Sequence, residues 1–455
     1  MSLVVHAVVT TVILVCGTQA SAQLQHPDPE KLGVEAVNDL VARHFSKVEA
    51  QFDERMQSAL PVERLSAVWD SLIEKAGPFE RILGTHVDEQ AGMSVVLVTC
   101  KFKGDTFDLQ LTLDSQDRIA GMRMLPGSIA PDGKQGWSAP DYAKPNTFHE
   151  VDVTVQAGDW KMPGTLTLPN GKGPFPAVVL VHGSGPEDQD ETIGGNKPFK
   201  DLAWGLASQN VAVLRYVKRT KQYGAQSLQP GVPFTVKQET TEDAEAAVGL
   251  LAARTEIDHS HIYVLGHSLG GTLAPRIAIA DKQVAGIIIA AGTAQPIENV
   301  IVQQLKYLAS LPGGNSDEMK KQVEAAESAK VEVESPSLKP DSTVSVLGIQ
   351  IPGSYFLDLR DYHPAEVAAQ LQIPILVLQG GRDYQVTTQD YDLWKAALAK
   401  DPRATFKLYP GLTHLFMTGK GSGQPSPSDY SVVGHVSGEV VQDIAQWVKN
   451  NQAAK

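Results

Sequence analysis

Cysteine is scarce in this chain, because only Cys16 and Cys100 occur among its 455 residues. Cys16 belongs to an apolar N-terminal stretch. Cys100 lies inside another apolar run, where a thiol is usually buried and inert. If the N-terminal stretch is removed as a leader, one thiol remains and no internal disulfide can form. The stability of the protein must then come from an apolar core rather than from cross-links.

Basic clusters and metal-binding patterns are also absent. The formal net charge is -13 at pH 7, and no run of Lys and Arg occurs. Phosphate binding needs clustered positive charge, so we expect no nucleic-acid partner. None of the twelve histidines falls in a ligand-spaced pair of the HExxH kind, so we expect no metal and no other cofactor. With 42% hydrophobic and 20% charged residues, the composition is that of a folded globular protein.

Residues 1–22 have the features of an export signal. An apolar run covers residues 3–16, and Ala20-Ser21-Ala22 then forms a cleavage site of the A-x-A kind. The run is too short to cross a bilayer comfortably. Val15 stands before Cys16, where a lipid-anchor signal would need a small residue. We therefore expect cleavage after Ala22, a secreted or periplasmic protein, and no stable membrane anchor.

Residues 28–125 change from a helical to a strand-like period. Apolar residues recur every three or four positions from Glu30 to Leu60, which predicts one long amphipathic helix. Pro61 opens a second helix, which Gly77-Pro78 closes. The period then falls to two, and this predicts three antiparallel strands at Met93–Phe102, Phe107–Leu113 and Ile119–Leu125.

Two helices followed by three strands predict a small α+β domain. It contains no cluster of convergent polar residues. We therefore expect it to act as a lid, a docking module or a dimerisation surface, and in the last case the chain forms a homo-oligomer. Residues 126–146 combine proline with Gly, Ser and Asp and show no period, which predicts a linker between domains.

Residues 147–455 alternate apolar strands with helices after an initial hairpin. Fully apolar strands separated by helices indicate a parallel sheet with helices on both faces. The ligand site of such a sheet lies beyond the carboxyl ends of its strands. From about residue 298 to 370, helices and a Pro/Ser-rich segment interrupt the alternation. We predict that this segment is a helical cap inserted over the site.

The stretch Tyr263–Gly271 is typical of a buried strand that runs through Gly-x-Ser-x-Gly into a helix. In this pattern the serine occupies a tight turn that exposes its hydroxyl, and the glycines Gly266 and Gly270 leave room around it. Ser268 is therefore the candidate nucleophile. The helix N-terminus beside it would stabilise a developing oxyanion. A Gly-Ser turn without chemistry is the alternative, because so short a pattern also arises by chance.

A second glycine-rich turn, residues 182–186 (HGSGP), follows an earlier apolar strand. The N–H groups of Ser184 and Leu269 would together form an oxyanion hole, in which each donor is typically worth about 3 kcal/mol in the transition state. An ordinary β-to-α turn is the alternative interpretation.

Two later strand ends supply an acid and a base. Asp383 follows the apolar run 375–378, and His414 lies on the loop after the last strand. The chain order Ser, Asp, His is the one that the α/β-hydrolase architecture uses. His414 would take the proton of Ser268, and Asp383 would orient His414. Other candidates are less suitable: His182 fits a structural role, His267 flanks the serine but cannot reach round to it, and His363, Asp358 and Asp361 lie in the cap.

Residues 150–450 resemble α/β-hydrolases of the dienelactone-hydrolase and serine-aminopeptidase-like branch. The resemblance rests on HGSGP at 182–186, GHSLGG at 266–271, GRDYQV at 381–386 and GLTH at 411–414. The N-terminal segment resembles an uncharacterised domain attached ahead of such hydrolases in secreted bacterial proteins, through FDERMQSALPVERL at 52–65 and Gly-Pro-Phe at 77–79. Where relatives commonly have aspartate the chain has Val217, so it lacks the carboxylate that would form a buried ion pair at this position.

The resemblance implies an esterase that acts on short acyl esters. We accordingly expect an exported serine carboxylesterase that cleaves small-molecule esters through an acyl-enzyme. A serine peptidase or aminopeptidase is the second hypothesis, because the same triad cleaves amides. An acidic rim on the cap would then select an amino terminus; its residues would be Glu324, Glu327, Glu332 and Glu334. A non-catalytic binding protein on the same fold is the alternative of another class.

Overall fold

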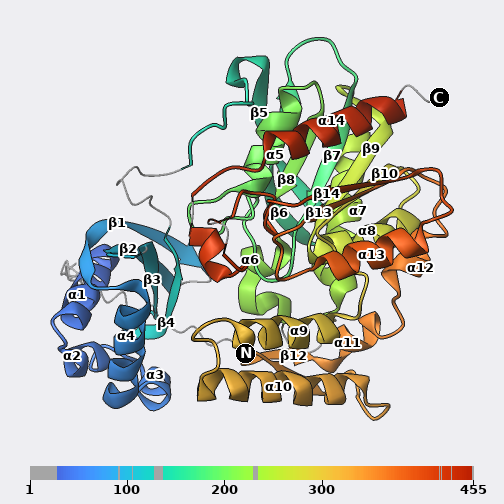
Figure 1. Ribbon diagram of the computed structural model, residues 1–455. Coiled ribbons are helices and arrows are strands. Elements are labelled where there is room, and N and C mark those ends of the chain that lie inside the picture. The colour runs from blue at the N-terminus through green and yellow to red at the C-terminus, as the bar shows by residue number, and fades with distance from the viewer. Residues whose placement is uncertain are drawn as a thin grey trace, which may run out of the picture.

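The computed structural model describes residues 28–90, 93–104, 106–127, 137–228, 234–419, 421, 423–431 and 433–452. The predicted export signal lies outside the described residues. Within them, no helix has both the length and the apolar character needed to cross a membrane. Figure 1 shows a small N-terminal domain beside a larger domain that is built on a central sheet.

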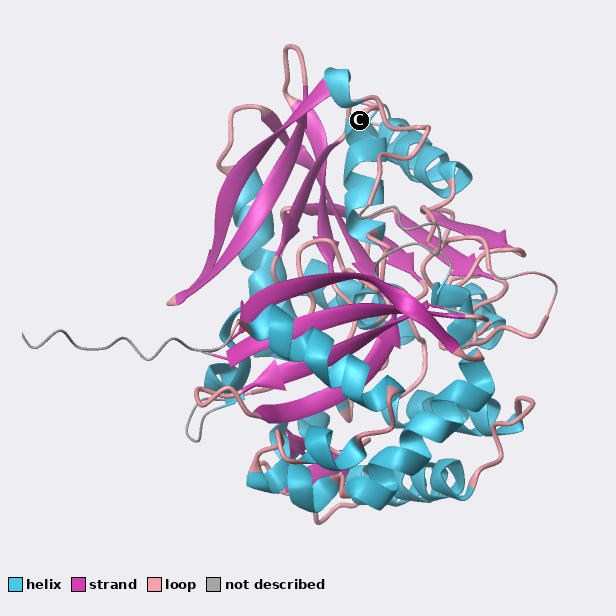
Figure 2. Cartoon of the chain, turned by 90° about the vertical axis from the view of Figure 1, so that its left-hand side faces the viewer, coloured by secondary structure: helices cyan, strands magenta, loops and turns pink. Residues whose placement is uncertain are grey.

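The N-terminal domain packs four helices on an antiparallel sheet of order β1-β2-β3-β4, and Figure 2 shows this domain toward the viewer. Buried side chains from both layers form an apolar core of its own, which includes Val37, Trp69, Val96 and Leu111. The elements are α1 (Pro29–Val41), α2 (Phe45–Glu49), α3 (Glu54–Ala59), α4 (Val62–Ala76), β1 (Phe79–Gln90), β2 (Met93–Phe102), β3 (Thr106–Leu113) and β4 (Ile119–Pro126).

The prediction of one long helix from Glu30 to Leu60 is wrong. The chain breaks after α1, where Arg43 takes a φ of 61°, and again before α3, where Phe52 forms a β-bridge with Ile119. Helical spacing persists across these breaks because each short helix presents its apolar face to the same core. The prediction of three strands also missed β1. This strand lies at the edge of the sheet, with irregular register near Arg81 and Gly84, so its polar residues hide the period of two.

The larger domain holds an eight-stranded mixed sheet of order β14-β13-β10-β9-β7-β8-β6-β5. The first six strands in this order, β14 to β8, are parallel to one another. Strand β6 is antiparallel to both of its neighbours, β8 and β5. The strands are β5 (Phe148–Ala157), β6 (Trp160–Pro169), β7 (Phe175–Val181), β8 (Ala212–Tyr216), β9 (Ile257–His267), β10 (Val284–Ala290), β13 (Ile375–Gly380) and β14 (Ala404–Tyr409).

Helices cover both faces of this sheet, as a buried parallel sheet requires. One core lies between the sheet and α5 and α14, where Leu202 and Val441 are buried. The other core includes Leu273, Val248 and Trp394 from the helices on the opposite face. The covering helices are α5 (Pro198–Ala207), α7 (Glu242–Ala252), α8 (Leu269–Ala280), α13 (Thr388–Ala397) and α14 (Gly438–Gln452); α6 (Arg219–Tyr223) and a π-helix (Lys237–Thr241) are shorter.

A long insertion separates β10 from β13. It consists of α9 (Ile297–Ser310), α10 (Asp317–Glu334), the hairpin β11 (Thr343–Val346) and β12 (Ile349–Pro352), α11 (Gly353–Leu359) and α12 (Pro364–Ala368). Val302 and Leu305 of α9 pack against Ala326 of α10. In Figure 1, α10 lies on the side of α9 that faces away from the sheet. The four glutamates of the expected acidic rim are exposed on α10, so their position does not support selection of an amino terminus at the site.

Candidate active site

Ser268 sits on a sharp turn between β9 and α8. Its backbone takes φ 53° and ψ -117°, a conformation that L-residues rarely adopt. A Cβ at Gly266 would lie 2.0 Å from the carbonyl oxygen of Gly270, and one at Gly270 would lie 2.3 Å from that of Val181. Only glycine fits at these two positions. The turn therefore presents the hydroxyl of Ser268 at the carboxyl end of β9, at the N-terminus of α8.

Asp383 and His414 lie together at the ends of the neighbouring strands β13 and β14. His414 Nδ1 is 2.6 Å from Asp383 Oδ2, and both side chains are almost fully buried. The other oxygen of Asp383 accepts hydrogen bonds from the N–H groups of Gln385 and Val386, at 2.8 and 3.0 Å. These donors fix the orientation of the carboxylate. A neutral His414 therefore carries its proton on Nδ1 and leaves Nε2 free to act as a base.

Gln379 supports this acid and was not singled out in the sequence. Its Nε2 lies 3.2 Å from Asp383 Oδ2 and 2.8 Å from the carbonyl oxygen of Val386. Gln379 is buried near the end of β13. The signal that would identify it is a lone amide in an otherwise apolar strand, four residues before the acid.

The glycine-rich turn after β7 lies directly against the nucleophile. A Cβ added at Gly183 would lie 3.2 Å from Cβ and 3.7 Å from Oγ of Ser268. Lys218, whose side chain is 2% exposed, donates to the carbonyl oxygen of Gly183 at 2.7 Å. Among the described residues, neither the N–H of Ser184 nor that of Leu269 donates a hydrogen bond. Both groups are therefore free to donate to a bound ligand.

The other sequence candidates either have structural partners or are exposed in the insertion. Burial lowers the pKa of His182 to about 4, and its Nε2 lies 3.0 Å from the carbonyl oxygen of Asp188. Asp358 pairs with Arg276 at 2.6 Å. His363 and Asp361 are exposed in the insertion. Within the described part of the chain, no group of three His, Cys, Asp or Glu side chains is placed to hold a metal ion.

The substitution at Val217 does not leave its basic neighbours unpaired. Lys218 pairs with Glu239 at 2.9 Å, and Arg219 forms an ion pair with Asp243 in which both side chains are buried. The two cations that follow β8 therefore find their partners on the π-helix and on α7.

Comparison with known proteins identifies the family. A model described as "Alpha/beta hydrolase family" matches residues 178–420, a range that spans the serine turn and both strand ends. The chain belongs to this family. A second model, described as "Protein of unknown function (DUF3887)", matches residues 34–122 of the hydrolase, within the N-terminal domain. The expected fold, an α/β-hydrolase sheet behind a small α+β domain, is thus confirmed.

Two curated relatives illustrate the match. The hydrolase is 38% identical to Esterase EstD of Thermotoga maritima over 412 residues, which cover 90% of this chain and 93% of that protein. It is 25% identical over 207 residues to the "Alpha/beta hydrolase domain-containing protein WAV2" of Arabidopsis thaliana, covering 45% of this chain and 54% of that protein.

Two solved structures align with part of the chain at low sequence identity. Est1E from Butyrivibrio proteoclasticus aligns with a TM-score of 0.44 at 16% identity, covering 66% of this hydrolase and 99% of that chain. The Pyrococcus furiosus esterase Pf2001 aligns with a TM-score of 0.42 at 16% identity, covering 72% and 96%.

Proposed function

We propose that this protein is a serine carboxylesterase that hydrolyses small-molecule esters through an acyl-enzyme on Ser268. The observation that carries this proposal is the buried contact between His414 and Asp383, next to His267, which precedes Ser268 on its strained turn. The relationship to Esterase EstD over 90% of the chain supports an ester as substrate.

The chemistry follows the roles that the geometry favours. Nε2 of His414 takes the proton of Ser268 as Oγ attacks the ester carbonyl carbon, and Asp383 stabilises the imidazolium that forms. The oxyanion of the tetrahedral intermediate accepts hydrogen bonds from the N–H groups of Ser184 and Leu269. His414 then returns the proton to the leaving alcohol, and the acyl-enzyme remains. Water, activated by His414 in the same way, releases the acid and restores Ser268.

We further propose that the insertion between β10 and β13 caps this site. Contacts from α9 to the loop that carries Asp383 support the proposal. Gln304 Nε2 donates to the carbonyl oxygen of Gln385 at 3.0 Å, and the rings of Tyr307 and Tyr384 stack with their centroids 5.9 Å apart. Side chains of this segment would then limit the size of the acyl group. Export through the first 22 residues is part of the same proposal and rests on the sequence alone.

The deciding experiment compares the native protein with Ser268→Ala on p-nitrophenyl acetate, p-nitrophenyl octanoate and an aminoacyl p-nitroanilide. We expect the variant to lose at least about 1,000-fold in kcat/KM on the esters, because the nucleophile is gone while binding remains. Equal turnover by the variant would refute the triad. Faster cleavage of the anilide than of the esters would favour the peptidase, and absence of turnover by the native protein would favour a binding protein.

A further inference from the structure

A second carboxylate–imidazole pair, Glu191 and His267, lies buried behind the candidate triad. Their side chains are 4% and 8% exposed, and Oε2 of Glu191 is 2.8 Å from Nδ1 of His267. The two groups form an ion pair. The other oxygen of Glu191 accepts the N–H of Gly183 at 2.7 Å. The carboxylate of Glu191 therefore contacts both the glycine-rich turn at residues 182–186 (the oxyanion turn) and His267, which precedes the candidate nucleophile Ser268.

His267 connects this carboxylate to the loop of the base. Its Nε2 lies 2.9 Å from the carbonyl oxygen of His414, and the two imidazole rings have centroids 4.6 Å apart. Nδ1 therefore faces a carboxylate and Nε2 faces a carbonyl oxygen, so both ring nitrogens face acceptors and the protonated ring is favoured. The same contact favours an ionised Glu191 beside that ring.

The titration of both groups agrees with this geometry. Burial by itself lowers the pKa of His267, but the facing Glu191 carboxylate outweighs it, and the pKa lies above its ordinary value. Burial by itself raises the pKa of Glu191, but His267 outweighs it, and the pKa lies below its ordinary value. Both shifts favour the charged forms of the two groups.

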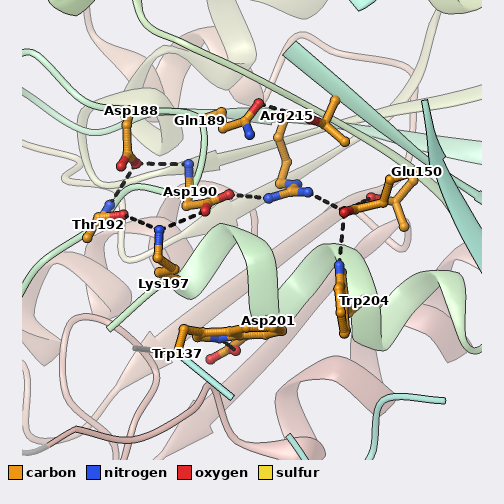
Figure 3. Close-up of polar contacts among 12 residues, drawn as sticks. Trp137, Glu150, Asp188, Gln189, Asp190, Thr192, Lys197, Asp201, Trp204 and Arg215 are labelled. Carbon is orange, nitrogen blue, oxygen red and sulfur yellow. Dashed lines mark hydrogen bonds and ion pairs between the residues drawn. The ribbon is translucent and has the colours of Figure 1, made fainter. Parts of the chain in front are cut away.

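A network of polar contacts fixes the loop that carries Glu191 (Figure 3). Oδ1 of Asp188 accepts the N–H groups of Asp190 and Thr192, which brackets Glu191 at a φ of 52°. Asp190 pairs with Arg215 of β8 and, at 3.0 Å, with Lys197. Arg215 continues to Glu150 of β5 at 2.5 Å. The central sheet therefore holds Glu191 in a backbone conformation that it would not adopt in a free loop.

We propose that Glu191 and His267 are positioning residues, which hold the oxyanion turn and the backbone of His414 in register with Ser268. The proposal deepens the esterase mechanism and rests on it. Glu191 fixes Gly183, next to the expected donor Ser184, and His267 fixes the residue that carries the base. Without the pair, the donor and the base would no longer be aligned when the transition state forms.

Other charged groups face this pair and enter any pH dependence. Glu187, His182 and Asp383 interact electrostatically with Glu191 or His267. Lys218 lies against Gly183 on the other side of the turn. The rings of Phe199 and Phe416 also pack near His267, with centroids 6.5 and 6.4 Å from that of its imidazole. Of these carboxylates, Glu191 makes the direct contact with the His267 ring.

The test uses Glu191→Gln, His267→Gln and the double variant in the full chain. Each substitution keeps the size and removes the charge. We expect kcat for p-nitrophenyl acetate to fall about 10- to 100-fold with a much smaller change in KM, as for outer partners of catalytic groups. The kcat of the double variant should be no lower than that of the less active single variant, because the two residues act as a unit. In His267→Gln the unpaired Glu191 charge should also move the acid limb of the kcat/KM profile to higher pH.

Asp201→Asn provides the matched control. Asp201, on α5, has a fully buried carboxylate that lies 3.0 Å from Nδ1 of His435. We expect this variant to melt at lower temperature with an unchanged kcat and an unchanged pH profile. Wild-type kcat in folded Glu191→Gln and His267→Gln would overturn the positioning role.

Two further comparisons keep the outcome decisive. If the Glu191 and His267 variants do not fold, Asp190→Asn loosens the same loop by weakening its pairs with Arg215 and Lys197, and it should lower kcat by a smaller factor. A lower melting temperature with unchanged kcat in that variant would overturn the proposal. Activity that persists in Ser268→Ala would instead refute the esterase mechanism itself, so the two failures are distinguishable.

Discussion

Glu187 directly follows the oxyanion turn, and its surroundings disfavour the ionised form of its carboxylate. Burial, and then the neighbouring charge of Glu191, raise its pKa from 4.5 to about 7. The folded state therefore binds this proton more tightly than the unfolded chain does. Stability from this group is fully present below pH 4.5 and is lost as the pH rises toward 7, because the unfolded chain then releases its proton first.

The first prediction concerns Glu187→Gln. We expect its melting temperature to match that of the native protein below about pH 4.5 and to exceed it at pH 8, since the amide cannot become charged. Melting curves at four pH values across this range test the idea. Glu318→Gln, on an exposed position of α10, provides the control and should show no such pH-dependent difference. A constant difference between native protein and Glu187→Gln at all pH values would contradict the assigned titration.

At the scale of elements, Lys218 joins three segments of the chain. Its Nζ donates to Gly183 on the oxyanion turn and pairs with Glu239 on the π-helix. The other oxygen of Glu239 accepts the hydroxyl of Tyr355, on α11 of the insertion, at 2.7 Å. This connection runs from the insertion to the turn beside Ser268, through side chains that are all buried.

Lys218→Met should therefore lower the free energy of unfolding by about 3–5 kcal/mol, because it leaves the Glu239 carboxylate buried without a partner. Urea unfolding measures this loss. Adding Glu239→Gln removes the stranded charge, so the double variant should recover much of the loss. Lys400→Met replaces an exposed lysine and should have little effect. A double variant as unstable as Lys218→Met would show that the ion pair is not the cause.

Elements with a clear period were predictable from the sequence, and those shaped by tertiary contacts were not. The strand Met93–Phe102 agrees in both bounds, because turn residues on both sides delimit its largely apolar run. Strand β1 was missed because its edge position leaves polar residues in the pattern. The long helix was wrong because a helical period continues through breaks that only the packing against Ile119 and its neighbours reveals.

The same distinction applies to the site. Ser268, Asp383 and His414 follow strands, so their place at one edge of the sheet could be inferred from chain order. Glu191 could not be inferred, because the loop DQDE at 188–191 offers three acids without a period. Which of them points inward depends on the turn at Asp188 and on Arg215, 24 residues beyond Glu191 in the chain.

At the scale of the molecule, the two domains keep separate apolar cores. We therefore expect the larger domain to fold without residues 23–125. In this prediction the deletion leaves kcat/KM on p-nitrophenyl acetate unchanged, because all the residues of the proposed mechanism lie beyond Asn146. The measurement pairs this assay with size-exclusion chromatography. An altered apparent size with full activity would assign the N-terminal domain to assembly, whereas loss of activity in a folded product would contradict the prediction.

The buried thiol of Cys100 has a practical consequence for following motion in this protein. It is 1% exposed, and burial raises its pKa to about 12, so it reacts poorly with maleimides at neutral pH. Apart from Cys16 in the expected leader, the chain has no other cysteine. Paired cysteines introduced on α10 and α14 would therefore accept fluorescent labels without prior removal of native thiols. Energy transfer between them would report whether the insertion moves during turnover.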